Sequence, residues 1–189
     1  MNTRIERETP LPATHSASLW ALLFFLALCF SAGIVGSALS DEGGTQWYFL
    51  LRKPDWAPPP WVFGPVWAFL YASMAFSAWW VWRMPDSLER RRALGLFLLQ
   101  LFFNAAWSPV FFRLGAIALS VVVIALLWAT LLLTTFAFSR LSRPAALLLL
   151  PYLAWVSFAA FLDIRIWQLN RSDVAEQQSI SVLSGLERS

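Results

Sequence analysis

The sequence predicts an all-α integral membrane protein, a bundle of five transmembrane helices with a long loop between the first and second helices. Two observations support this fold class. Of the 189 residues, 59% are apolar and only 13% are charged, against about 45–50% and about 25% in a typical soluble domain. The charged residues lie between the apolar runs and at the two ends, which keeps charge out of the bilayer interior. A water-soluble core could not bury this excess of apolar residues.

The first apolar run predicts the first transmembrane helix at residues 19–39. A run of this length crosses about 30 Å of hydrocarbon at roughly 1.5 Å per residue. A cleaved signal peptide is the alternative, but its apolar core would span only about 7–15 residues. Residues 1–18 before it mix charged residues, prolines and small polar residues, which favours a flexible N-terminal tail.

The long loop is predicted at residues 40–61, where charged residues and glycines are followed by three consecutive prolines. Prolines in a row forbid a continuous helix. The second helix then covers about residues 62–83, with Pro65 tolerated in its first turn. The third and fourth helices, at residues 93–112 and 116–138, are joined by so tight a turn that they must be antiparallel neighbours.

The last predicted helix covers residues 145–167, with a kink at Pro151. The residues that follow are polar, and we expect residues 171–189 to form a flexible C-terminal tail. The membrane domain is therefore placed at residues 19–170.

Residue types argue against several classes of function. The single cysteine, Cys29, cannot form an intrachain disulfide or a zinc cluster. The single histidine, His15, lies in the predicted tail, so the bundle has no His to ligate haem, join a metal cluster or complete a Ser-His-Asp triad. The basic residues form no stripe with aromatics, which argues against nucleic-acid binding. We expect no metal, no obligatory cofactor and no catalytic residue.

Twelve tryptophans exceed what anchoring five helices at the membrane interfaces requires. Interface anchoring remains the ordinary explanation for many of them. Others fall in or beside the proline-rich loop, or on helix faces that also carry polar groups, and are candidates for a ligand site. These candidates are Trp47, Trp56, Trp61, Trp67, Trp107 and Trp155.

Three predicted helices carry inward polar or aromatic faces. On the third, Gln100, Asn104 and Ser108 are four residues apart and form one stripe, with Trp107 close to it. The corresponding faces are Trp67, Tyr71 and Met74 on the second helix, and Tyr152, Trp155, Ala159 and Asp163 on the fifth. Two interpretations stay open: hydrogen bonding and packing between helices, or the walls of a ligand cavity.

Two further patterns concern helix ends and helix contacts. Asp163 and Arg165 are two residues apart and do not face each other on a helix. We therefore expect them to reach towards the membrane interface and form no buried ion relay. On the first helix, Ala32, Gly36 and Ser40 recur every four residues, which allows close helix approach, either within the chain or between two copies of it.

Three blocks of sequence resemble the tryptophan-rich sensory protein and translocator protein family, once called peripheral benzodiazepine receptors. The first block, at residues 47–67, contains KPDWAPPPW; the second, at 103–112, reads FNAAWSPVFF; the third, at 150–155, reads LPYLAW. The blocks resemble the family's sequences in order and spacing. The resemblance covers about residues 19–170.

The resemblance implies a five-helix bundle whose first loop folds over a pocket for porphyrins and isoquinoline or benzodiazepine-type ligands. It also implies a receptor or sensor for tetrapyrroles that takes part in their transport or regulation, with homodimers common in the family. By motif position the pocket residues would be Trp47, Tyr48, Trp67, Asn104, Trp107, Trp155 and Ala159. The candidates and faces described above add Trp56, Trp61, Tyr71, Gln100 and Tyr152.

The chain departs from the family at the end of the last helix. Animal members carry a sterol-recognition pattern of Leu/Val, Tyr and Lys/Arg, whereas residues 162–168 read LDIRIWQ and lack the Tyr. Such patterns are weak even when intact, and we predict no tight sterol binding. Two alternatives to a non-enzymatic receptor remain: light-dependent degradation of bound porphyrin, and a helical scaffold without a ligand of its own.

Overall fold

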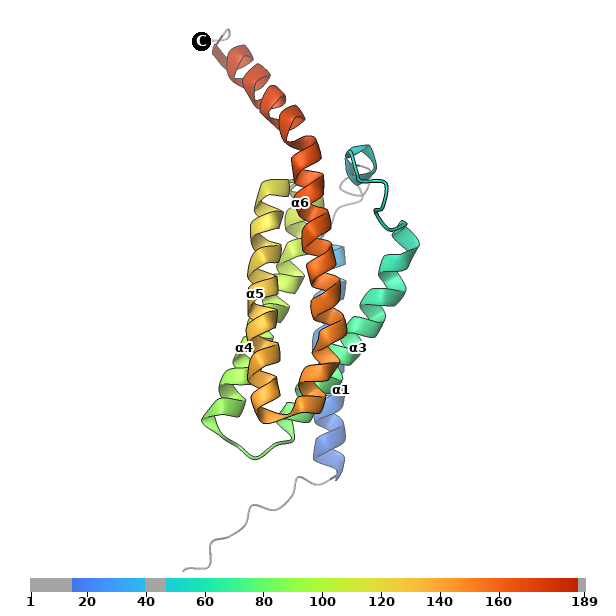
Figure 1. The fold of residues 1–189 in the computed structure, drawn as a ribbon, viewed down its shortest axis with the longest axis vertical. Coiled ribbons are helices and arrows are strands. Elements are labelled where there is room, and N and C mark those ends of the chain that lie inside the picture. Colours follow the sequence, from blue (N-terminus) through green and yellow to red (C-terminus); the bar gives the residue numbers. More distant parts are fainter. Residues whose placement is uncertain (1–14, 40–46, 187–189) are drawn as a thin grey trace, which may run out of the picture.

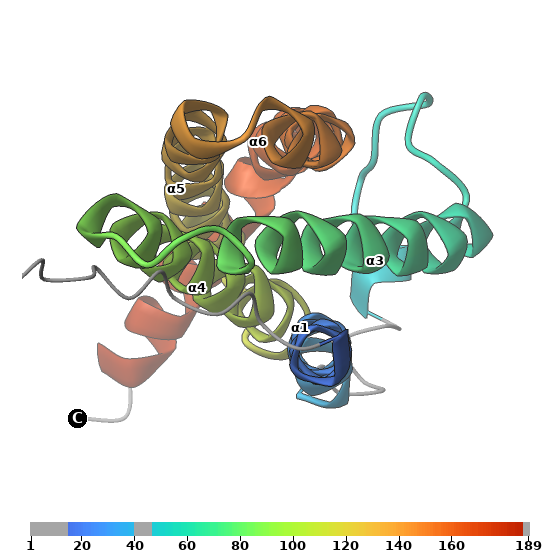
Figure 2. The same ribbon diagram turned by 90° about the horizontal axis from the view of Figure 1, so that it is seen from below.

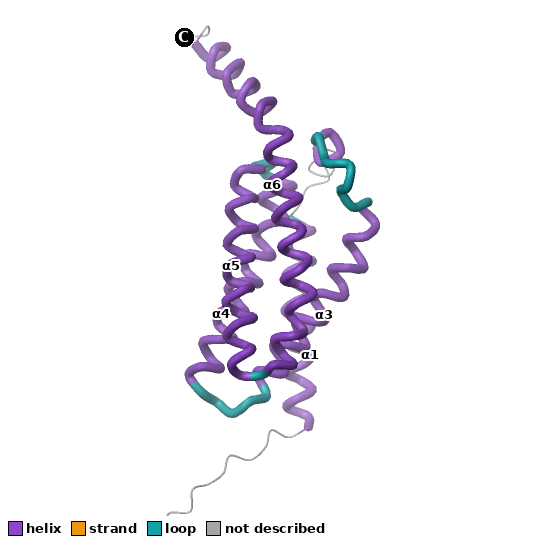
Figure 3. Tube along the Cα trace, in the orientation of Figure 1, coloured by secondary structure: helices purple, strands orange, loops and turns teal. Residues whose placement is uncertain are grey.

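The computed structural model describes residues 15–39 and 47–186, with side chains for residues 18–39 and 47–171. Within these residues the chain is helical apart from short connectors (Figure 3). Five of its helices are long and apolar enough to cross a membrane. The all-α, five-helix prediction is therefore confirmed. Residues 1–14 of the tail proposed at residues 1–18, and residues 40–46 of the predicted loop, lie outside the described residues.

The five long helices follow the predicted order (Figure 1). Their bounds are α1 His15–Ala38, α3 Phe63–Trp82, α4 Leu88–Ser108, α5 Ile117–Leu141 and α6 Arg143–Leu186. A short 3-10 turn, η1 (Pro60–Val62), leads into α3, and a π-helical turn, η2 (Pro109–Arg113), continues α4. Pro109 stands at the start of η2, where its missing N–H disturbs the regular α-helical pattern.

With η2 counted as the continuation of α4, three boundaries differ from the prediction by four residues or more. α1 begins at His15, inside the proposed tail and before the expected start at residue 19. α4 begins at Leu88, before the expected start at residue 93, because Ser87 caps the helix by accepting a hydrogen bond from the Arg90 backbone N–H at 3.1 Å. α6 continues to Leu186, beyond the expected end near Trp167. Polar residues there do not stop the helix, since no proline follows Pro151 in the sequence.

The helices pack as a closed ring. α1 contacts α3 and α4, α5 contacts α4 and α6, and α6 contacts α3, which Figure 2 shows from below. The predicted pairing of α4 with α5 is confirmed. The α3–α4 connector and the α5–α6 turn lie at the lower end in Figure 1, and residues 47–60 lie at the upper end.

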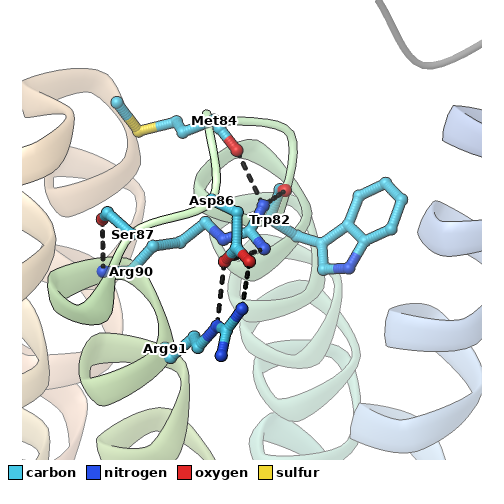
Figure 4. Close-up of polar contacts among 6 residues, drawn as sticks. All are labelled: Trp82, Met84, Asp86, Ser87, Arg90 and Arg91. Carbon is cyan, nitrogen blue, oxygen red and sulfur yellow. Dashed lines mark hydrogen bonds and ion pairs between the residues drawn. The ribbon is translucent and has the colours of Figure 1, made fainter. Parts of the chain in front are cut away.

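Charge and capping hold the lower end together (Figure 4). The Asp86 carboxylate accepts a hydrogen bond from Arg90 Nη2 at 2.7 Å and also pairs with Arg91. Arg90 Nη1 donates to the backbone carbonyls of Trp82 (3.0 Å) and Met84 (2.7 Å) at the end of α3. The hydrogen bond from Arg91 is the main cause that lowers the pKa of Asp86. Carbonyls left over at the helix end are thus paired with a guanidinium.

Small residues let α1 approach its neighbours closely. A Cβ at Gly33 would lie 2.8 Å from Cζ of Tyr71 on α3, so only glycine fits there. A Cβ at Gly36 would lie 3.4 Å from the Ala105 carbonyl oxygen on α4. Gly36 of the predicted small-residue face therefore packs within the chain. Ser40 lies outside the described residues, and a homodimer stays a prediction.

Candidate ligand-binding site

A cavity of about 340 Å³ lies at the end of the bundle that carries residues 47–60. Its size is near the lower limit of small-molecule pockets, which span roughly 300–1,000 Å³. Three of the predicted site residues, Tyr48, Trp107 and Ala159, line it. The remaining walls are largely apolar side chains from η2, α6 and the start of α3, among them Phe63, Phe111, Phe112, Leu162 and Ile166.

Stacked aromatic rings make one wall of the cavity. The Trp107 indole stacks on Phe111 with centroids 5.3 Å apart and an angle of 20° between the planes. These residues are four apart, so the inward face of α4 continues into η2. The Tyr48 ring stands edge-on to Phe111 at 6.0 Å and to Phe112 at 5.7 Å. The wall therefore offers flat, rigid aromatic surfaces to a ligand.

Asp163 supplies a buried carboxyl group to the same cavity. Asp163 is only 2% exposed, and its side chain is among those that line the cavity. Trp107 Nε1 donates to Oδ2 at 3.1 Å, and the Ser120 hydroxyl lies 3.0 Å from both carboxyl oxygens. The expectation that Asp163 reaches the membrane interface was wrong. Its position four residues after Ala159 places it on the inward face of α6.

Asn170 holds residues 47–53 next to the cavity, and Lys53 stabilises the segment from within. The Asn170 side chain accepts a hydrogen bond from the Arg52 backbone N–H at 3.0 Å and donates one to the Arg52 carbonyl at 2.9 Å. Lys53 Nζ donates to the Tyr48 carbonyl at 2.8 Å and lies 4.4 Å from the centre of the Tyr48 ring. Burial raises the pKa of the Tyr48 hydroxyl. The segment is thus joined to α6 by polar bonds.

A second group of predicted residues forms a buried hydrogen-bonded cluster that joins α3, α4 and α6. Tyr71 Oη donates to Asn104 Oδ1 at 3.0 Å, and Asn104 Nδ2 donates to Tyr152 Oη at 2.8 Å. Trp67 stacks on Tyr71 with centroids 5.3 Å apart. These four residues pack in the core and are not among the cavity-lining residues.

Gln100 and Trp155 carry polar atoms that find no hydrogen-bond partner among the described residues. Gln100 is fully buried, and both of its amide atoms are unpaired. The indole Nε1 of Trp155 is likewise buried and unpaired. The Trp155 ring lies 5.8 Å from Phe63, a cavity-lining residue, so Trp155 stands one ring behind the wall.

The three remaining predicted tryptophans lie around the cavity without lining it. Trp47 packs edge-on against Phe111 at 5.8 Å. It lies beside Gly115, where an added Cβ would be 3.5 Å from the Trp47 ring and where a φ of 59° makes the tight turn into α5. Trp56 stacks on Phe161 at 5.4 Å and remains 44% exposed. Trp61 is 75% exposed. The latter two face outward, as interface anchors do.

Several residues of the site were missed by the sequence reasoning. Phe111 and Phe112 stood in the second family block, four and five residues after Trp107, and helical spacing could have selected them. The role of Ser120 had no sequence signal, because α5 is apolar around it. Asn170 offered one weak signal, a polar side chain just beyond the last apolar run.

The fold and the cavity define a multi-pass membrane protein whose helix ends enclose an aromatic-lined cavity. The TspO/MBR family model matches residues 25–168. The tryptophan-rich protein TspO of Chlorobaculum tepidum is 40% identical over 153 residues, which cover 79% of this chain and 95% of that protein. The human translocator protein is 37% identical over 154 residues, covering 80% and 91% of the two chains. The tryptophan-rich sensory protein of Cereibacter sphaeroides is 37% identical over 152 residues, covering 80% and 92%.

The chain therefore belongs to the TspO/MBR family, as its three sequence blocks indicated.

Proposed function

We propose that this protein is a membrane receptor or sensor that binds a tetrapyrrole, such as a porphyrin, in the cavity. Isoquinoline and benzodiazepine-type ligands would occupy the same space. The observation that carries the proposal is the stacked pair of Trp107 and Phe111 in the cavity wall. A porphyrin is flat and largely apolar, so parallel aromatic surfaces suit its faces. The names of the relatives, a sensory protein and a translocator protein, are consistent with this role.

The polar groups around the cavity give the ligand a preferred direction. Asp163 presents carboxyl oxygens, which accept hydrogen bonds from N–H groups and do not favour another carboxylate. The Lys53 ammonium group lies over the ring of Tyr48, which lines the cavity where residues 47–53 border it. The carboxylates at the edge of a porphyrin would therefore point towards Lys53 and away from Asp163.

Titration of the purified protein with protoporphyrin, followed by the shift of the Soret band, tests the proposal. We expect saturable binding, and a loss of affinity of about two- to tenfold in Trp107→Leu, because an aromatic contact contributes roughly 0.5–1.5 kcal/mol beyond its buried area. Trp61→Leu is the matched control, since Trp61 is exposed and outside the cavity. Equal effects of the two variants would refute the site. Absence of saturable binding would favour a scaffold without a ligand.

A second candidate function is light-dependent degradation of the bound porphyrin. It is favoured by one observation: the Trp107 indole lines the cavity, where it would contact the bound ring. Illumination of the complex should then bleach the Soret band faster than illumination of free porphyrin. Trp107→Phe should keep binding but slow the bleaching. A passive receptor would show no protein-dependent loss of the band.

A further inference from the structure

A second hollow lies on the outer surface of the bundle, between the end of α5 and the start of α6. This α5–α6 groove has a volume of about 450 Å³, and most of its lining is apolar. Phe136, Leu147 and Leu150 line it and are exposed, Leu147 by 61%. Because both helices span the membrane, these side chains face hydrocarbon. The groove therefore suits a long apolar chain.

Two arginines stand where the groove meets the α5–α6 turn. Arg143, the first residue of α6, lines the groove itself. The Arg140 guanidinium, in the last turn of α5, lies 4.8 Å from the centre of the Phe136 ring. Both side chains are exposed. Neither guanidinium pairs with a carboxylate of the described residues, whereas Asp86 pairs with Arg90 and Arg91.

The contrast with the neighbouring α3–α4 connector is informative. That connector lies at the same end of the bundle (Figure 1), and two of its arginines, Arg90 and Arg91, share the single carboxylate of Asp86 (Figure 4). The positive charge of Arg140 and Arg143 has no such internal counterion among the described residues. An occupant of the groove would therefore need an apolar chain for the groove itself. It would also need an anionic group at the membrane interface, next to Arg140 and Arg143.

We propose that the α5–α6 groove binds an anionic phospholipid. Its acyl chain lies along Phe136, Leu147 and Leu150, and its phosphate is held by Arg140 and Arg143. Guanidinium groups bind phosphate oxygens through paired, charge-assisted hydrogen bonds. Basic pockets between transmembrane helices are suited to acidic headgroups. A zwitterionic lipid is a weaker occupant, because its ammonium group opposes the arginines.

A second copy of this chain is a poorer occupant of the same groove. In a twofold dimer the same surface meets itself, which would bring Arg140 and Arg143 of each copy near those of the other. Like charges brought together at an interface are destabilising. A lipid phosphate instead supplies the missing opposite charge.

Native mass spectrometry of the full-length protein tests the site. The protein is released from micelles containing equal amounts of phosphatidylglycerol and phosphatidylcholine with identical acyl chains. We expect the wild type to retain phosphatidylglycerol at least fivefold more often. The Arg140→Gln/Arg143→Gln variant should lose this preference. A wild type with no preference between the lipids would overturn the proposal.

Two further variants separate the groove from general surface charge. Arg83→Gln/Arg92→Gln removes the same charge at the same end but outside the groove, and should keep the preference. Leu147→Trp fills the groove from an exposed position and leaves both arginines in place, and should lower phosphatidylglycerol retention at least threefold. Loss of the preference in Arg83→Gln/Arg92→Gln, or unchanged retention in Leu147→Trp, would overturn the site.

Discussion

The two ends of the bundle are held together in different ways. At the connector end, Asp86 pairs with arginines four and five residues away, and these side chains are partly or largely exposed. At the cavity end, Trp107 bonds to Asp163 across 56 residues, and Arg52 bonds to Asn170 across 118. The connector end thus depends on local pairs, whereas the cavity end depends on contacts between distant segments. Substitutions at the two ends should therefore change the stability of the protein by different amounts.

The largest loss of stability is expected for a substitution where α1 meets α3. In Gly33→Val the new side chain would collide with the Tyr71 ring, since a Cβ alone would approach Cζ to 2.8 Å. Overpacking of this kind costs about 1–3 kcal/mol, and we expect the upper part of that range. The matched control is Gly95→Ala on α4, where a Cβ meets nothing within 4 Å and helix propensity predicts a gain of up to about 1 kcal/mol. Thermal unfolding in detergent, followed by circular dichroism, should show opposite shifts.

The next largest loss of stability is expected in the buried hydrogen-bonded cluster of Tyr71, Asn104 and Tyr152. Asn104→Leu removes the hydrogen bonds to Tyr71 and Tyr152, and bonds between transmembrane helices contribute about 0.6–2 kcal/mol. We expect a loss of about 1–2 kcal/mol in the same assay. If the loss comes from the unpaired hydroxyl groups, adding Tyr71→Phe and Tyr152→Phe should restore part of the stability. Strictly additive losses in the triple variant would contradict this account.

A smaller effect is expected at the contact between α6 and the loop. Asn170→Leu removes both bonds to the Arg52 backbone, and because they are only part-buried we expect a combined cost of about 1 kcal/mol, the lower end of the range for two bonds. The loop should then open more often, and trypsin should cut faster after Arg52. Gln168→Leu is the control, because Gln168 is exposed and its side chain accepts a hydrogen bond from Arg165 on the same helix. Equal cleavage rates in the two variants would show that Asn170 does not hold the loop.

The smallest effect is expected at the connector. The pKa of Asp86 is lowered in the folded state by its hydrogen bond with Arg91. Its contribution is therefore present above the unfolded pKa, about 3.9, and is lost as the pH falls through the lower folded pKa. Asp86→Asn should remove this acid-side part of the stability profile, with little change at neutral pH, since exposed pairs contribute little. A pH profile identical to that of the wild type would contradict the assignment.

Part of the candidate site followed from residue spacing. The inward stripe of Gln100 and Asn104 is buried, and Ser108 and Trp107 at its end line the cavity. Spacing did not distinguish lining residues from those packed behind them. Trp155 and Trp107 both occupy inward faces, yet only Trp107 is among the lining residues. That difference depends on how far each helix is rotated and tilted against its neighbours, which no local pattern records.

The sequence by itself determined the membrane environment, the five spans, the long first loop and the family. A bilayer requires long apolar runs and expels charge, so these features can be read along the chain. Only the tertiary structure decided that Asp163 is buried and bonds to Trp107 and Ser120, and that Asn170 holds the loop at Arg52. These bonds join residues far apart in the sequence. They exist because the ring of helices brings the ends of α4, α5 and α6 together at one end of the bundle.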